Sequence, residues 1–309
     1  MRLSRRILFT VAALLVALFL TPSAQAISLA NRVFVSARSG NDANACNNIL
    51  TPCQTFAGAV LQLNPGGEAI VLDSGGYGPV TITQSVIIEA PTGVTAFIHP
   101  PSGDAVTVNA AGATVVLRGL SMDGAGAGTN NGINVQAVSV LHVENCVIAA
   151  FPNGNGIFFG SAGQLFVKDT IIRGIGGPGI WVGPASGTAQ ASVDRCRLEQ
   201  NGFGLVTDNE FGGTAKATIR DSVASGNSGA GLDAEFGSEL NAEQCLVANN
   251  ILGLDSYGTG SILQASNCTV TDNSTGLYIY AGGSLLSRQN NTVQGNATKG
   301  SFTGTFLAD

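Results

Sequence analysis

Residues 231–277 read GLDAEFGSELNAEQCLVANNILGLDSYGTGSILQASNCTVTDNSTGL, and one unit repeats within this stretch. Its clearest mark is a Gly-Leu pair that recurs after 22 and then 23 residues, at 231, 253 and 276. Between the pairs lie short apolar/polar alternations separated by Gly, Asn, Asp and Ser, with no helical period. Such a pattern is typical of short strands joined by turns, and a fixed period of this length indicates a solenoid.

The same unit extends through most of the chain in two independent frames. The first frame is Gly followed by Ile or Leu: Gly132, Gly156, Gly179, Gly204, Gly231, Gly253 and Gly276. The second is an apolar or small polar position, with spacings of 23 to 26 residues: Leu120, Cys146, Thr170, Cys196, Ser222, Cys245, Cys268 and Asn291. Three short strands in each unit fit one turn of a single-stranded parallel β-helix. The fold class is therefore all-β, with about nine coils.

Two columns of residues test whether the coils are stacked, because equivalent residues then lie about 4.8 Å apart. Five residues after the second frame stand five asparagines that can bond from coil to coil: Asn201, Asn227, Asn250, Asn273 and Asn296. Two residues before it stand six charges in strict alternation: Arg118, Glu144, Lys168, Asp194, Arg220 and Glu243. Alternation stabilises neighbouring strands, whereas like charges destabilise them, so the column indicates stacked coils.

The ends of the repeat define the expected organisation of the chain. TPCQTFAGAVLQL at 51–63 places Phe56, Ala59, Val60 and Leu63 at helical spacing, which predicts a helix covering the first coil. We expect a signal peptide at 1–26, a cap segment at 27–69, the β-helix at 70–303 and a tail at 304–309. The helix is followed by GGEAIVL at 66–72 and then Gly76-Tyr77. This order resembles the start of the pectin-lyase-like superfamily, which implies a right-handed β-helix.

The first 26 residues read as an export signal. Arg2, Arg5 and Arg6 precede an apolar stretch of 14 residues, and Ala24-Gln25-Ala26 supplies a cleavage pattern. The stretch is short for a membrane span, so we expect cleavage near Ala26 and a secreted or periplasmic protein, monomeric and without a membrane span. Removing those arginines leaves 11 basic against 20 acidic residues. This acidic surface argues against nucleic acid as a partner.

The six cysteines divide into two groups. Cys46 and Cys53 flank the N-terminal cap and are expected to form a disulfide in an exported protein. Cys146, Cys196, Cys245 and Cys268 share the second frame with Thr170 and Ser222. Side chains stacked in parallel do not surround a tetrahedral ion, so we expect buried, reduced thiols that pack as small apolar residues.

The Gly-[Ile/Leu] frame also predicts which residues face outward on one sheet. With Ile or Leu inward, the next residue points out: Asn134, Phe158, Trp181, Val206, Asp233, Asp255 and Tyr278. Two residues further along, Asp208, Glu235, Tyr257 and Tyr280 also point out. The single tryptophan and three of the four tyrosines thus share a face with four carboxylates. Grouped surface aromatics usually mark a binding surface, and rings beside carboxylates suit sugars. The substrate-binding candidates are therefore Trp181, Phe158, Tyr278, Tyr257 and Tyr280.

Three interpretations of the acids remain open. Asp233 and Asp255 lie on adjacent coils, about 5 Å apart, the separation that retaining glycosidases use, so they are the catalytic candidates. Together with Asp208 and Glu235 they form a candidate Ca²⁺ site, since Ca²⁺ takes six to eight oxygen ligands. The third interpretation is a solvated acidic strand face without chemistry.

The catalytic motifs that this superfamily uses are missing. The polygalacturonase Gly-His-Gly and Arg-Ile-Lys motifs and the epimerase Asp-Pro-His-Glu motif are absent, and the predicted face carries no Arg or Lys. An acidic cleft repels polyuronates unless Ca²⁺ bridges them, so a neutral polysaccharide or cell-surface glycan is the expected partner. The sequence supports two hypotheses: a protein that binds or processes a polysaccharide, by hydrolysis or elimination if it is an enzyme, or a non-catalytic structural or adhesive surface solenoid.

Overall fold

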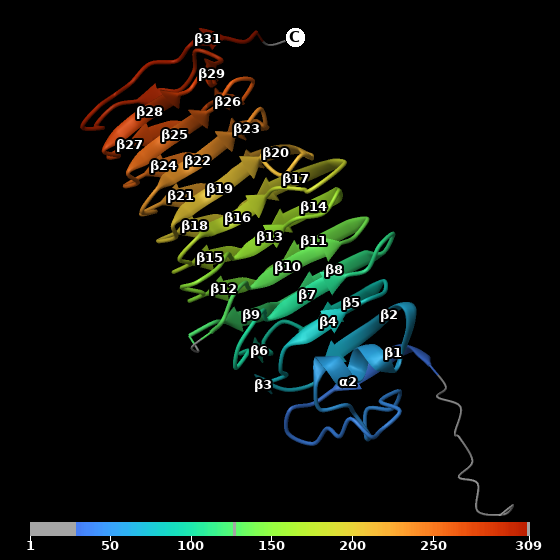
Figure 1. Ribbon diagram of the computed structural model, residues 1–309. Helices are drawn as coiled ribbons and strands as arrows, with labels where there is room; N and C mark the ends of the chain where they lie inside the picture. Colours follow the sequence, from blue (N-terminus) through green and yellow to red (C-terminus); the bar gives the residue numbers. More distant parts are fainter. Residues whose placement is uncertain (1–28, 126–127, 308–309) are drawn as a thin grey trace, which may run out of the picture.

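The computed structural model describes residues 29–125 and 128–307, and they form a solenoid of three parallel sheets. Figure 1 shows the coils stacked along one axis, with the two ends of the described chain at opposite ends of the solenoid. The predicted signal peptide lies outside the described residues. In the part that the structure describes, no helix is long and apolar enough to span a membrane.

The first sheet has twelve strands, in the order β1 (Ala30–Val35), β2 (Leu63–Val71), β5 (Val86–Glu89), β8 (Thr114–Arg118), β11 (Val140–Glu144), β14 (Gly163–Lys168), β17 (Thr188–Asp194), β20 (Thr214–Arg220), β23 (Glu239–Glu243), β26 (Ile262–Ser266), β29 (Ser284–Ser287) and β31 (Gly304–Thr305). Each coil contributes one strand, and each strand pairs in parallel with the equivalent strand of the next coil. β1 and part of β2 lie within the segment that the sequence assigns to the cap, and β31 lies in the predicted tail.

The second sheet has ten short strands: β3 (Gly75–Gly76), β6 (Ala96–Ile98), β9 (Leu120–Asp123), β12 (Val147–Ala149), β15 (Ile171–Arg173), β18 (Arg197–Glu199), β21 (Val223–Ser225), β24 (Leu246–Ala248), β27 (Thr269–Thr271) and β30 (Thr292–Val293). The third has nine: β4 (Val80–Ile82), β7 (Val106–Asn109), β10 (Ile133–Ala137), β13 (Ile157–Phe159), β16 (Pro178–Val182), β19 (Phe203–Asp208), β22 (Ala230–Glu235), β25 (Leu252–Tyr257) and β28 (Thr275–Tyr280). The all-β prediction of about nine coils is confirmed.

A left-handed residue makes the turn between the first and second sheets in six successive coils, with φ between 49° and 53°: Asn145, Asp169, Arg195, Asp221, Gln244 and Asn267. Residues other than glycine rarely adopt this conformation, although Asn and Asp do so more readily. The sharp turn directs the following side chain inward. That side chain is buried in every one of these coils, and the four cysteines among them are unpaired, as predicted.

The two diagnostic columns are stacked as the sequence predicts. Strand register places the charges opposite one another from Arg118 to Glu243, and Arg118 also pairs with Glu89 of the preceding coil. In the asparagine column, each backbone N–H from 201 to 273 donates to the side-chain oxygen one coil further on, at 2.9–3.0 Å. The column is buried apart from the half-buried Asn296.

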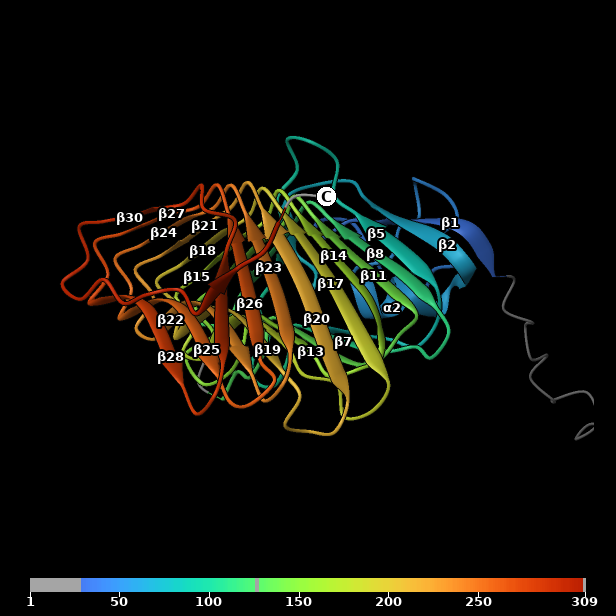
Figure 2. The same ribbon diagram turned by 90° about the horizontal axis from the view of Figure 1, so that it is seen from above.

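A short helix closes the N-terminal end of the core. α2 (Phe56–Leu61) begins at Thr55, whose side chain accepts a hydrogen bond from the Gly58 N–H. Phe56 stacks on the buried Tyr77 at 5.0 Å between ring centroids. Cys46 and Cys53 form the predicted disulfide. The opposite end has no helix among the described residues, and Figure 2 shows the C-terminal segment running across it.

Candidate functional site

The outer side of the nine-stranded sheet carries the residues that the Gly-[Ile/Leu] frame predicts. Ile157, Ile180, Leu205, Leu232 and Leu254 are fully buried, so the residue after each of them faces outward. Strand register aligns these outward residues as one row, which we name row one: Asn134, Phe158, Trp181, Val206, Asp233, Asp255 and Tyr278.

A second outward row lies two residues further along the same strands. Row two contains Asp208, Glu235, Tyr257 and Tyr280, which are register partners in that order. Asp233 and Asp255 are direct partners in row one, so their Cα atoms occupy adjacent strands about 4.8 Å apart. The structure therefore brings together the aromatic and acidic candidates on one face.

The interpretation of a solvated acidic face is wrong. Asp233 is 1% exposed, Asp208 2% and Asp255 7%. These three carboxyls are therefore shielded from solvent although their strand positions point outward. Phe158, Trp181, Tyr257 and Glu235 are half-buried, and only Tyr278 and Tyr280 among the aromatic candidates are exposed.

Aromatic rings gather on both sides of the acids. Toward the N-terminal coils, Trp181 contacts Phe158 at 5.3 Å and Phe211 at 5.8 Å between ring centroids. Toward the C-terminal end, Tyr257 contacts Tyr280 at 5.6 Å and Phe236 at 5.0 Å. We name these the tryptophan cluster and the tyrosine cluster. Each contains a phenylalanine that sequence reasoning missed, because Phe211 and Phe236 come from turns that lie outside the repeating register.

Burial makes the two central acids hard to ionise. Desolvation raises the pKa of Asp233 well above its ordinary value, and the charges of Asp255 and Glu235 raise it further. Desolvation followed by the charge of Glu235 raises the pKa of Asp255 to about 7. One oxygen of each carboxyl is buried without a hydrogen-bond partner in the described residues. Near neutral pH the pair therefore retains a proton, which leaves an acid beside a carboxylate.

Burial also affects the neighbouring acids Asp208 and Glu235 and the indole N–H of Trp181. Burial raises the pKa of Asp208 and of Glu235, although the Glu210 N–H donates to Asp208 at 2.6 Å and opposes the shift. The buried indole Nε1 of Trp181 makes no hydrogen bond of good geometry with the described residues, although its N–H interacts with the Asp208 carboxyl and lowers the pKa of that group. Buried polar atoms without a hydrogen bond of good geometry are uncommon in proteins, and three of them lie in row one.

The geometry gives no support to a cation at this face. In residues 29–125 and 128–307, no group of three or more His, Cys, Asp or Glu side chains is placed to hold a metal ion. The predicted Ca²⁺ ligands Asp208, Asp233, Glu235 and Asp255 lie side by side in two flat rows instead of surrounding a point. A buried pair that keeps a proton is also a poor cation ligand.

Comparison with known proteins places the chain in a family. Residues 131–298, more than half of the chain, match the family described as the right handed beta helix region. The chain belongs to this family. The match covers β10 to β30 and therefore all four acids and both aromatic clusters of this right-handed β-helix protein. No curated protein matches its sequence significantly.

Solved structures agree with the family assignment at the level of fold. An alginate lyase from Paenibacillus sp. str. FPU-7 superposes with a TM-score of 0.58 at 12% identity, covering 89% of this chain and 98% of the lyase. XylC in complex with xylose gives a TM-score of 0.50 at 10% identity, covering 82% of this chain and 71% of XylC. At these identities the similarity concerns the right-handed β-helix itself.

Proposed function

We propose that the protein binds a neutral polysaccharide along rows one and two and that Asp233 and Asp255 act on its glycosidic bond. The observation that carries the proposal is a buried pair of acids, Asp233 and Asp255, in register on adjacent strands between two aromatic clusters. Trp181 and Tyr278 are four coils apart, or about 19 Å at the usual strand spacing. A chain of several sugar rings spans that length.

The side chains suit a sugar more than any other ligand class. Aromatic rings offer large apolar surfaces with little conformational entropy to lose, and sugar rings have apolar faces that stack on them. The unpartnered oxygens of Asp233 and Asp255 need partners that ring hydroxyls supply. The four carboxyls and the lack of a cation in either row favour a neutral chain over a polyuronate.

The acid pair fits retaining hydrolysis. In that reaction one carboxylic acid protonates the leaving oxygen and a carboxylate about 5–5.5 Å away attacks the anomeric carbon. Asp233, the more deeply buried partner, whose pKa burial raises well above its ordinary value, is the proton donor in this proposal. Asp255, with a pKa of about 7 and more exposure, is the nucleophile.

Binding is tested with neutral oligosaccharides and the Trp181→Ala variant. Loss of an aromatic anchor costs about 1–3 kcal/mol, so we expect the Kd to rise about 5- to 150-fold. Phe166→Ala is the control, because Phe166 is an exposed aromatic ring on β14, in a different sheet. Equal affinity in the native and Trp181→Ala proteins would remove the binding site from this face.

Catalysis is tested separately with Asp233→Asn and Asp255→Asn. Each variant should lose turnover of a bound oligosaccharide and keep its affinity, whereas Glu239→Gln on β23, which is half-buried, ion-paired with Lys216 and outside both rows, should change neither. Binding without turnover by the native protein would favour the non-catalytic surface solenoid, a role for which the near-complete burial of Asp233 is the supporting observation.

We also propose that the protein acts outside the cytoplasm. The Cys46–Cys53 disulfide supports this location, because disulfides persist mainly in oxidising compartments. N-terminal sequencing of the protein recovered from its native source tests the proposal. A chain that begins near Ile27 is expected, and a chain that retains Met1 would contradict it.

A further inference from the structure

The C-terminal end of the solenoid is closed by a strap and not by a helix. The strap, residues 298–307, follows β30, begins beside β28 and ends beside β29. Its carbonyls at Thr298 and Lys299 accept hydrogen bonds from Gly276 and Leu277 at 2.8 and 3.0 Å. At its other end, β31 pairs with β29 through Leu286 and Ser287. The strap thus crosses from the nine-stranded to the twelve-stranded sheet over the open core.

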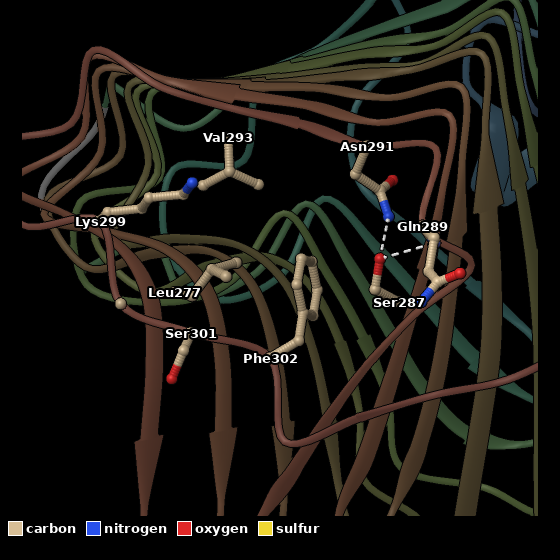
Figure 3. A pocket seen from close by; sticks show the side chains of 9 residues that line it. Leu277, Ser287, Gln289, Asn291, Val293, Lys299, Ser301 and Phe302 are labelled. Atoms are coloured by element: carbon tan, nitrogen blue, oxygen red, sulfur yellow. Dashed lines mark hydrogen bonds between the residues drawn. The ribbon is translucent and has the colours of Figure 1, made fainter.

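A cavity of about 400 Å³ remains beneath the strap. This volume is within the range of small-molecule sites. Figure 3 shows Leu277, Val293 and the ring of Phe302 around its middle, where the last coil has no successor to cover it. Leu277 is almost fully buried, and the other two side chains are half-buried. The centre of the cavity is therefore apolar.

Polar groups lie at two opposite sides of this apolar centre in Figure 3. On one side is the exposed Lys299, whose ammonium group makes no ion pair or hydrogen bond with the described residues. On the other are Ser287 and Gln289. The Ser287 Oγ accepts from the Gln289 N–H and from Asn291 at 2.9 and 3.0 Å, which leaves its own O–H free to donate. The Gln289 side-chain amide is also without a partner in the described part of the chain.

The charge of the lining is unusual for this protein. The chain carries 20 acidic and 14 basic residues, yet the cavity lining contains Lys299 and no Asp or Glu. Solvent reaches the donors of Lys299 and Gln289, and an occupant with oxygen acceptors at its two ends, one of them anionic, would replace that water as their partner. The apolar centre selects a hydrophobic body between them.

We propose that the cavity beneath the C-terminal strap binds a small amphiphilic monocarboxylate with a second oxygen at its far end. The carboxylate pairs with Lys299, the hydrophobic body packs between Leu277, Val293 and Phe302, and the far oxygen accepts from Ser287 or Gln289. This site is independent of rows one and two, which lie on the outer side of the sheet.

The probe for the test is 4-hydroxycinnamate, with its methyl ester as the uncharged comparison. Calorimetric titration of the native protein should show saturable binding at one site and at least tenfold weaker binding of the ester. Lys299→Gln should weaken binding of the carboxylate at least tenfold and remove its advantage over the ester. Phe302→Ala should weaken both probes, because they share the apolar body.

Lys168→Gln is the matched control, since it removes the same charge from an exposed position on β14, many coils away. It should bind the carboxylate like the native protein. Thermal unfolding of Lys299→Gln should match the native curve, because the ammonium group holds no other group in place. No saturable binding, equal affinity for acid and ester, or an equal loss in Lys299→Gln and Lys168→Gln would overturn the proposal.

Discussion

Two buried carboxyl side chains in register on adjacent coils are costly to ionise. Asp233 and Asp255 both have raised pKa values in the folded chain, whereas in the unfolded chain they return to about 3.9. The folded protein therefore binds more protons than the unfolded one between about pH 4 and pH 7. By linkage, stability falls as pH rises through this window.

Asp255→Asn tests this consequence, because an amide cannot ionise. Below pH 4 the native carboxyl is protonated in both states, so the variant should differ little in stability from the native protein. At pH 8 it should be more stable by about 1–3 kcal/mol, since it avoids the cost of a buried charge. Urea unfolding at several pH values is the measurement.

Asp272→Asn is the control for that series. Asp272 is exposed on the turn after β27, and its left-handed backbone is compatible with Asn. We expect a change within about 0.5 kcal/mol across the pH range, as for other surface substitutions. If Asp255→Asn raises the free energy of unfolding by the same amount at every pH, ionisation of the Asp255 carboxyl does not destabilise the fold.

The direction of each side chain was predictable, but its exposure was not. Alternation along a strand fixes that Asp233 and Trp181 point outward, and the repeat aligns them across coils. The exposure of a side chain depends also on which neighbouring side chains and turns cover it. Phe211 and Phe236, which complete the aromatic clusters, lie in turns without periodicity, so no pattern in the sequence announced them.

At the scale of elements, the asparagine column is a continuous hydrogen-bonded ladder. The side chain of Asn250 accepts two bonds from Asn227 and donates to Ala224 and Asn273, all at 2.9–3.0 Å. Asn250→Ala leaves several of these buried partners unsatisfied, so we expect a loss of about 2–4 kcal/mol in urea unfolding. Asn296→Ala, at the half-buried end of the ladder, should cost clearly less because water replaces the amide. Equal costs would contradict the ladder.

The charge column should be weaker and sensitive to salt. Asp194 pairs with Arg220 at 3.0 Å and with Arg195 at 2.7 Å, and Lys168 is its other register partner. Asp194→Lys places three cations in successive coils, and we expect a loss of about 1–2 kcal/mol that shrinks at high salt. Glu243→Lys should cost about half as much, since Arg220 is its single charged register partner. An effect independent of salt would mean that packing, and not charge, is responsible.

These columns explain why the sequence predicts the architecture so well. Each coil must match the chemistry of the coils on both sides, so the residue pattern that specifies the fold recurs in every coil of the chain. The sequence pattern that specifies each end occurs only once. The cap helix is predicted within a few residues, because Phe56, Ala59 and Val60 show helical spacing. The return of the strap onto β29 has no sequence signal, since β31 comprises two residues that pair through backbone atoms.

At the scale of the molecule, the two ends are closed unequally. α2 and the disulfide cover the first coils, whereas a strap above a cavity covers the last. In a solenoid each coil contacts only its neighbours, so opening begins where the closure is weakest. We expect amide hydrogen exchange in β28 and β30 to be faster than in β4 and β5. Mass spectrometry of exchanged peptides measures this, and faster exchange beside α2 would contradict it.

The parallel register of the coils also has a mechanical consequence. β1 and β31 are the outermost strands of the twelve-stranded sheet, so tension between the two ends acts along the solenoid axis, in line with the hydrogen bonds between coils. Under such a load, the hydrogen bonds between one pair of coils break at a time, and the next pair breaks only afterwards. Each coil holds 23 to 26 residues, and its release lengthens the chain by about 80–90 Å. Stretched from its ends, the molecule would extend in low, evenly spaced steps, like a spring that yields one turn at a time.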